Sequence, residues 1–310
     1  MTVIKHIPED FIVEEVTTIS PKNCGEYTLF LLKKKNMNTI DALQSLSKIW
    51  RIPLKRIGYS GNKDKKAITT QTCSAKGNIK EIATENISVK IIGRSERPVS
   101  LGLNKGNKFT ITVRNVDKIP IINEKFVNYF GSQRFGERNP EIGLKILKKE
   151  YEKVVELLRK TNNEVEEFAE KNPKNFVGAI KTIPIQKLKI YIHSYQSKIW
   201  NECVKESVQK KRNIEECPLP GFGTNIAEHP ELSEKLRNDR LTTKSFVIRI
   251  IPEISSEGGI RKVHCKAENL KVEFENDEIF KEKKKVTLKF FLSKGCYATE
   301  FIKQNFDIDF

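Results

Sequence analysis

The sequence lacks the cysteine and histidine spacing of a metal site or of a disulfide-rich secreted domain. Its six cysteines lie far apart and form no C-x-x-C pair; they are Cys24, Cys73, Cys203, Cys217, Cys265 and Cys296. Only four histidines are present, and His193 lies in a helical pattern that favours a packed side chain over a metal ligand. We therefore predict reduced thiols, no metal and a cytoplasmic location.

No segment has the pattern of a membrane span or of a secretion signal. The N-terminal residues MTVIKHIPEDF contain no apolar signal-peptide core. No apolar run approaches the ~20 residues that a spanning helix needs. We expect a soluble protein that does not bind a membrane.

Several enzyme motifs are also missing. The sequence has no G-x-x-x-x-G-K-[ST] phosphate loop and no G-x-G-x-x-G after a strand, which weighs against P-loop NTPases and Rossmann-type methyltransferases. Neither G-x-S-x-G nor H-E-x-x-H occurs. The chemistry must therefore be sought outside these classes.

Positive charge, in contrast, is abundant. The chain has 56 lysines and arginines against 40 aspartates and glutamates, a formal net charge of +16 at pH 7. Such an excess is typical of a protein that binds a polyanion, because neutralised phosphates release counterions. A lysine-rich surface set by genome composition or thermal adaptation is the alternative. The runs Lys33–Lys35 and Lys283–Lys285 are predicted to be solvated; the alternative is that they extend the surface that binds the polyanion.

Hydrophobic periodicity predicts strands at both ends of the chain and helices between them. Strands are expected within residues 10–32, 87–92, 108–116 and 286–292, and helices at 39–52, 141–160, 187–208 and after Gly295. At 310 residues, two domains are expected. The layout favours one α+β domain made from both termini with a helical insertion, although a tandem of two domains gives a similar pattern.

One carboxylate stands in a locally positive loop, GNKDKKAITTQ (residues 61–71). Asp64 lies among Lys63, Lys65 and Lys66, and Gly61 permits backbone angles that side chains forbid. A charge-balanced surface scatters such charges. An isolated acid in this setting is a candidate catalytic group for an anionic substrate.

A second segment, NYFGSQRFG (residues 128–136), combines aromatics with an arginine between two glycines. Aromatic rings beside arginine can stack on a nucleic-acid base and contact phosphate. The alternative is that Phe130 and Phe135 are ordinary core residues.

These two segments, in their order, resemble the TruD family of tRNA pseudouridine synthases. Three further stretches also match: IKHIPEDFIVE (4–14), SYQSKIWN (194–201) and LKFFLSKGCYATE (288–300). The patterns G-x-K-D-x-x-A-x-T-x-Q and N-Y-F-G-x-Q-R-F-G are highly specific, and the matches span nearly the whole chain.

The resemblance implies roles for four residues. Asp64 matches the essential aspartate that isomerises uridine, Phe130 the aromatic that stacks on the target base, Asn128 a polar active-site residue, and Lys5 a basic residue near the aspartate. A cation within about 4–6 Å would favour the ionised carboxylate. Whether Asp64 attacks the sugar or removes a proton from it stays open.

The resemblance also implies an α+β fold with a mostly antiparallel central sheet, interrupted by an inserted TRUD α/β domain. The expected catalytic domain comprises residues 1–140 and 255–310, and the insertion 141–254. The implied reaction is isomerisation of a tRNA uridine, uridine 13 above all, with tRNA as partner and no metal or nucleotide cofactor. A non-catalytic tRNA-binding or folding protein on the same fold is the alternative, and the oligomeric state is not predicted.

Overall fold

The structure, a computed structural model, describes residues 2–306 and 308 and divides into two compact units. The first comprises the described residues within Met1–Phe126 and Cys265–Asp309, and the second comprises Val127–His264. The first unit is therefore built from both ends of the chain. Within the described residues, no helix is long and apolar enough to cross a membrane.

The junctions between the units lie at residues 126/127 and 264/265, whereas the sequence placed them near 140 and 254. The reason is backbone pairing inside the second unit. The Asn128 N–H donates to the Val263 carbonyl at 2.7 Å, so the two flanks of this unit are held to each other. That these units are a catalytic and an inserted domain stays a prediction.

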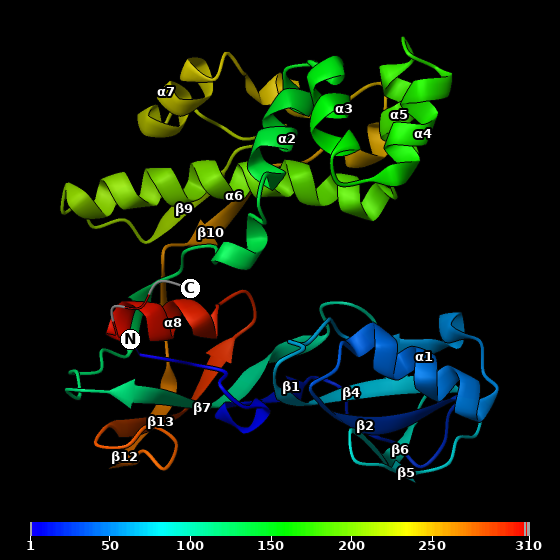
Figure 1. Cartoon of the computed structure of the whole chain (residues 1–310), viewed down its shortest axis with the longest axis vertical. Helices are drawn as coiled ribbons and strands as arrows, with labels where there is room; N and C mark the ends of the chain where they lie inside the picture. Colours follow the sequence, from blue (N-terminus) through cyan, green and yellow to red (C-terminus); the bar gives the residue numbers. More distant parts are fainter. Residues whose placement is uncertain (1, 307, 309–310) are drawn as a thin grey trace. The chain divides into compact units, whose positions relative to one another are not determined.

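A nine-stranded, mostly antiparallel sheet is the frame of the first unit (Figure 1). Its order is β12-β13-β7-β1-β4-β2-β6-β5, with β3 paired to β4; β1 and β4 run parallel. The strands are β1 (Phe11–Thr17), β2 (Tyr27–Lys35), β3 (Ile57–Tyr59), β4 (Ile68–Lys76), β5 (Ile82–Ala83), β6 (Ile87–Ser95), β7 (Asn104–Val116), β12 (Glu268–Asn276) and β13 (Lys284–Ser293). With helices α1 (Thr39–Trp50) and α8 (Ala298–Phe306), this makes the predicted α+β fold.

Strand alternation builds the core on one half of this sheet. Phe109 and Ile111 of β7 lie opposite Phe290 and Leu288 of β13, and all four are buried. Phe301 of α8 packs on Phe290 with ring centroids 4.6 Å apart. Helix α8 therefore covers the β7–β13 half, as the alternating sequence and the C-terminal helix predicted.

Helix α1 contributes to the core of the other half. Its residues Leu43 and Leu46 are fully buried in a cluster with Phe30 of β2. The helix ends at Trp50 because Arg51 adopts a left-handed conformation with φ 57°. The predicted start at Thr39 is confirmed, and the helix ends before Pro53 is reached.

The second unit is mainly helical. Its helices are α2 (Asn139–Leu147), α3 (Tyr151–Arg159), α4 (Asn163–Lys171), α5 (Phe176–Lys181), α6 (Ile185–Gln209) and α7 (Pro230–Asn238). A two-stranded antiparallel sheet pairs β9 (Glu216–Leu219) with β10 (Gly259–Lys262), and helix α7 lies between these strands in the sequence. Helix α2 approaches α6 closely because Gly143 has no side chain: a Cβ there would lie 2.2 Å from the Tyr191 carbonyl oxygen. The helix predicted at 187–208 is confirmed as α6.

The single helix predicted over residues 141–160 is wrong. Two helices occupy this range, and Lys149, which separates them, has a left-handed φ of 61°. The apolar spacing continues across the break, so periodicity alone does not reveal it.

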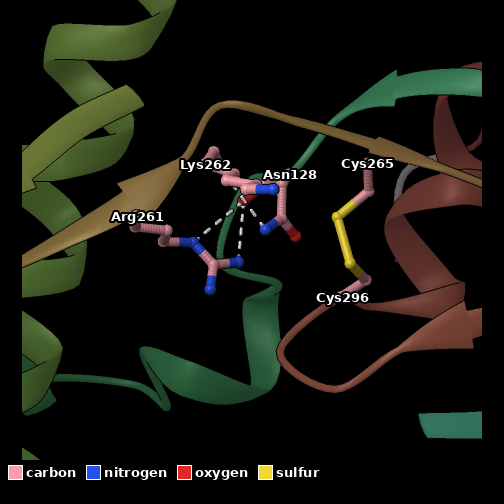
Figure 2. Close-up of a disulfide and its surroundings, with 5 residues drawn as sticks. All are labelled: Asn128, Arg261, Lys262, Cys265 and Cys296. Carbon is pink, nitrogen blue, oxygen red and sulfur yellow. Dashed lines mark hydrogen bonds between the residues drawn. A yellow bond between two sulfur atoms is a disulfide. The ribbon is translucent and has the colours of Figure 1, made fainter. Parts of the chain in front are cut away.

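The prediction that every cysteine is reduced is also wrong. Cys265 on β11 (His264–Lys266) and Cys296, in the turn between β13 and α8, form a disulfide with an S–S distance of 2.13 Å (Figure 2). Their 31-residue separation carries no sign of the contact, which depends on the folded sheet. The cysteines that are free are Cys24, Cys73, Cys203 and Cys217.

Candidate functional site

The loop between β3 and β4 presents Asp64 partly to solvent. The side chain of Asp64 is 31% exposed, and its Oδ2 accepts a hydrogen bond from Lys5 Nζ at 3.1 Å. Lys5 Nζ also lies 4.0 Å from the centre of the Phe11 ring. The structure thus brings together the acid and the lysine that the sequence paired.

A buried ion network fixes the N-terminal segment that carries Lys5. Arg114 of β7 donates from Nε to Asp10 Oδ1 at 2.8 Å and from Nη1 to Asp277 Oδ1 at 3.0 Å. Val3 and Arg114 also exchange two backbone hydrogen bonds. All three charged groups are buried, so this segment is tied firmly to the central sheet.

Beneath the loop, Lys34 holds the backbone of Asp64. It is 1% exposed, and its Nζ donates to the carbonyls of Met37 at 2.6 Å, Asp64 at 2.8 Å and Lys63 at 3.4 Å. Burial lowers the pKa of Lys34 to about 8, the nearby charge of Asp64 opposes this and that of Lys63 adds to it. The expectation that this lysine is solvated is wrong.

A second buried ion pair anchors the residue before Asp64. Lys63 Nζ lies 2.6 Å from Glu15 Oε2, both side chains are buried, and Ser60 Oγ donates to the same carboxylate. The Lys63 N–H donates to Thr39 Oγ1 at 2.9 Å. The side chain of Lys63 is therefore buried, while that of the next residue, Asp64, remains partly exposed.

Gln71, the last residue of the loop motif, links the start of the loop to helix α1. Gln71 Nε2 donates to the Gly61 carbonyl at 3.2 Å, and Thr39 Oγ1 donates to Gln71 Oε1 at 3.3 Å. Both Thr39 and Gln71 are buried. Lys65 and Lys66, in contrast, are exposed at the tip of the loop, where they can meet an anion.

In the second unit, Phe130 lies in an aromatic and cationic cluster. It is 7% exposed, meets Trp200 edge to face at 5.5 Å, and has the Arg261 guanidinium carbon 4.1 Å from its ring centre. The side chain of Asn201 pairs with both backbone groups of Phe130 at 2.9 Å. The ring is thus fixed by its backbone and covered by a cation.

Asn128 is buried beside this cluster. Its carbonyl accepts from Arg261 Nη2 at 2.8 Å, and its Nδ2 donates to the Lys262 carbonyl at 3.4 Å (Figure 2). Its Oδ1 is buried with no hydrogen-bond partner in the described part of the chain. A buried acceptor of this kind is uncommon and can receive a hydrogen bond from a ligand.

A cleft of about 380 Å³ in the second unit opens at Phe130. Arg134, Arg261 and His193 contribute to its walls, and Glu257 is the acidic residue that lines it. Burial, and then the charge of Arg134, lower the pKa of His193, so the imidazole is neutral near pH 7. Aromatic and guanidinium groups together suit a planar ligand that carries negative charge.

Sequence reasoning missed three residues of these two groups. Strand alternation could have found Lys34, which shares a strand face with Leu32 and Phe30, and Glu15, which shares one with Val13. No local signal identifies Arg261, because its hydrogen-bond partner Asn128 lies 133 residues earlier.

The chain matches one protein-family model over most of its length, that of "tRNA pseudouridine synthase D (TruD)", at residues 1–171, 159–218 and 205–304. It is 31% identical to "Probable tRNA pseudouridine synthase D" of Nanoarchaeum equitans, over 99% of this chain and 100% of the relative. It is 29% identical to "tRNA pseudouridine synthase D" of Aquifex aeolicus, over 99% of this chain and 98% of the relative.

The fold has a solved counterpart as well. A crystal structure of a Methanosarcina mazei protein named as a tRNA pseudouridine synthase D (TruD) superposes with a TM-score of 0.75. The match covers 99% of this chain and 93% of that one, at 24% sequence identity. The two proteins therefore share a fold.

Proposed function

The chain belongs to the TruD family of tRNA pseudouridine synthases, and on that basis we propose that it converts a uridine of tRNA, uridine 13, to pseudouridine. The observation that supports this most is the Asp64 loop. The partly exposed carboxylate of Asp64 is ion-paired to Lys5, and the backbone carbonyl of Asp64 accepts a hydrogen bond from buried Lys34. Two exposed lysines beside it can meet the RNA backbone.

The proposed reaction is an isomerisation and needs no co-reactant. The bond between uracil N1 and sugar C1′ breaks, the uracil turns, C5 bonds to C1′, and the proton on C5 leaves as N1 gains one. Ionised Asp64 either attacks C1′ or removes a proton from the sugar. Both routes require a carboxylate held at a fixed position, which the Lys5 and Lys34 contacts provide.

Phe130 and Asn128 are proposed to hold the uracil once it leaves the RNA stack. Stacking on an aromatic ring is worth about 1–3 kcal/mol and offsets the cost of unstacking. Arg261 lies 4.1 Å from the Phe130 ring centre, so a base that stacks on this face of the ring has to displace the guanidinium. The unpartnered Oδ1 of Asn128 is a fitting acceptor for an N–H of the base.

Tritium release from tRNA labelled with [5-³H]uridine tests the proposal. We expect release by the wild type and none by Asp64→Asn, with both proteins binding tRNA equally. A transcript with cytidine at position 13 should release no tritium above the background of the variant. Tight binding without release by either protein would favour a non-catalytic tRNA-binding protein, and equal release by both would refute the role of Asp64.

A further inference from the structure

A larger cleft of about 640 Å³ lies elsewhere in the second unit, between the α2–α3 junction and residues 242–250. We call it the α2–α3 cleft. It shares no lining residue with the cleft at Phe130. Buried Leu147 and Ile248 contribute apolar surface, and the half-buried ring of Tyr151 lines it as well.

The charge of this cleft has one sign. Lys149, Lys244 and Arg249 line it and are exposed, and no aspartate or glutamate is among its lining residues. None of the three cations forms an ion pair within the described residues. The carboxylate next in sequence, Glu150, is already bound to Lys145 at 2.8 Å.

Three cations without a protein counterion repel one another, and an anion from outside relieves this repulsion. An aromatic ring and an apolar surface beside them also suit a planar base. The ring of Tyr151 is uncharged near neutral pH, as for any tyrosine, and does not repel phosphate. Both halves of a nucleotide thus find a matching surface within one cleft.

We propose that the α2–α3 cleft binds a nucleotide of the tRNA substrate, its base against Tyr151 and its phosphate on Lys244 and Arg249. This inference rests on the proposed function, because it takes tRNA as the ligand. It assigns the helical unit a direct contact with RNA that is separate from the uridine cleft at Phe130.

The test measures the Kd of an unmodified tRNA transcript as a function of salt. For the double variant Lys244→Gln/Arg249→Gln we expect a Kd raised about tenfold at 0.1 M salt and a salt slope reduced by about 1.5. Tyr151→Leu should raise the Kd at least about fivefold while keeping the slope. The matched control, Lys171→Gln/Lys174→Gln, removes two exposed cations outside the cleft and should leave the Kd unchanged.

A wild-type Kd and slope in the charge variant would overturn the proposal. If that variant does not fold, a photocrosslinking amino acid at exposed Val247 gives an independent result: a crosslink to tRNA supports the cleft, and its absence overturns it. Tritium release by the wild type is measured in parallel. If the wild type releases no tritium while the charge variant loses binding as expected, the isomerase is refuted and the cleft is supported. If the wild type releases tritium while the charge variant binds tRNA as the wild type does, the cleft is refuted.

Discussion

Replacing Lys34 by methionine is expected to separate turnover from stability. Methionine fills similar space, but it cannot donate to the carbonyls of Met37 and Asp64, which Lys34 now contacts at 2.6 and 2.8 Å. The Asp64 backbone then loses its support while the core volume stays nearly constant.

Two opposing contributions set the effect of Lys34→Met on stability. Keeping Lys34 charged at pH 7 with a pKa of about 8 instead of 10.5 costs about 3 kcal/mol, which the substitution removes. The two short hydrogen bonds that are lost, from a charged donor to the carbonyls of Met37 and Asp64, are worth about 1.5–3 kcal/mol each, and the contact with the Lys63 carbonyl at 3.4 Å is too long to add much. The net loss in unfolding free energy is therefore about 3 kcal/mol or less, whereas turnover should fall about 100-fold, as for a misplacement of about 1 Å.

Single-turnover tritium release and urea unfolding measure the two quantities on the same preparation. Lys33→Met is the matched control, because its side chain on the same strand is exposed; it should change unfolding by less than about 0.5 kcal/mol. Full turnover by Lys34→Met would refute the positioning of Asp64 by Lys34. A loss of turnover that matches the unfolded fraction would refute it as well.

The lowered pKa of Lys34 predicts that, as the pH rises above 8, turnover falls while the free energy of unfolding increases. Above pH 8 its neutral amine has two protons for three carbonyls, so wild-type turnover should decline, and Lys34→Met should lack this limb. Because the unfolded chain binds more protons than the folded protein between pH 8 and 10.5, this group raises stability over that range. The same alkaline limb in both proteins would contradict the assignment.

Two further predictions concern the first unit. Arg114→Leu leaves Asp10 and Asp277 buried without their partner and should cost about 3–5 kcal/mol in urea unfolding; a cost under 1 kcal/mol would show that the network is not needed. Reducing the Cys265–Cys296 disulfide opens a loop of 31 residues and should lower the unfolding free energy by about 3–4 kcal/mol. Thermal unfolding with and without reductant measures this, and no shift in melting temperature would contradict it.

The sequence predicted regular elements where one periodicity runs without interruption. Helix α6 and strand β7 appear where their apolar spacing placed them, since burial of one face decides both position and type. The break between α2 and α3 was not predictable in this way, because Lys149 adopts a left-handed conformation that is uncommon for a lysine.

Linear motifs predicted the acid of the site and its lysine partner. Asp64 and Lys5 could be matched to a family pattern, and they do meet at 3.1 Å. The groups that support them, Lys34 and Glu15, lie on strand faces that charged residues rarely occupy, and the charge of Lys34 suggested solvent exposure. Contacts such as that of Arg261 with Phe130 arise from chain segments far apart in sequence and depend on the completed fold.

The two-ended construction of the first unit has a consequence for synthesis on the ribosome. Strand β7 is complete at residue 116, but its partner β13 begins at residue 284. At about 5–20 residues per second, β7 waits roughly 10–30 s with its edge open, while the continuous second unit has time to fold. This open edge, which carries Phe109 and Ile111, exposes the nascent chain to aggregation over that time and is a natural place for a chaperone to bind.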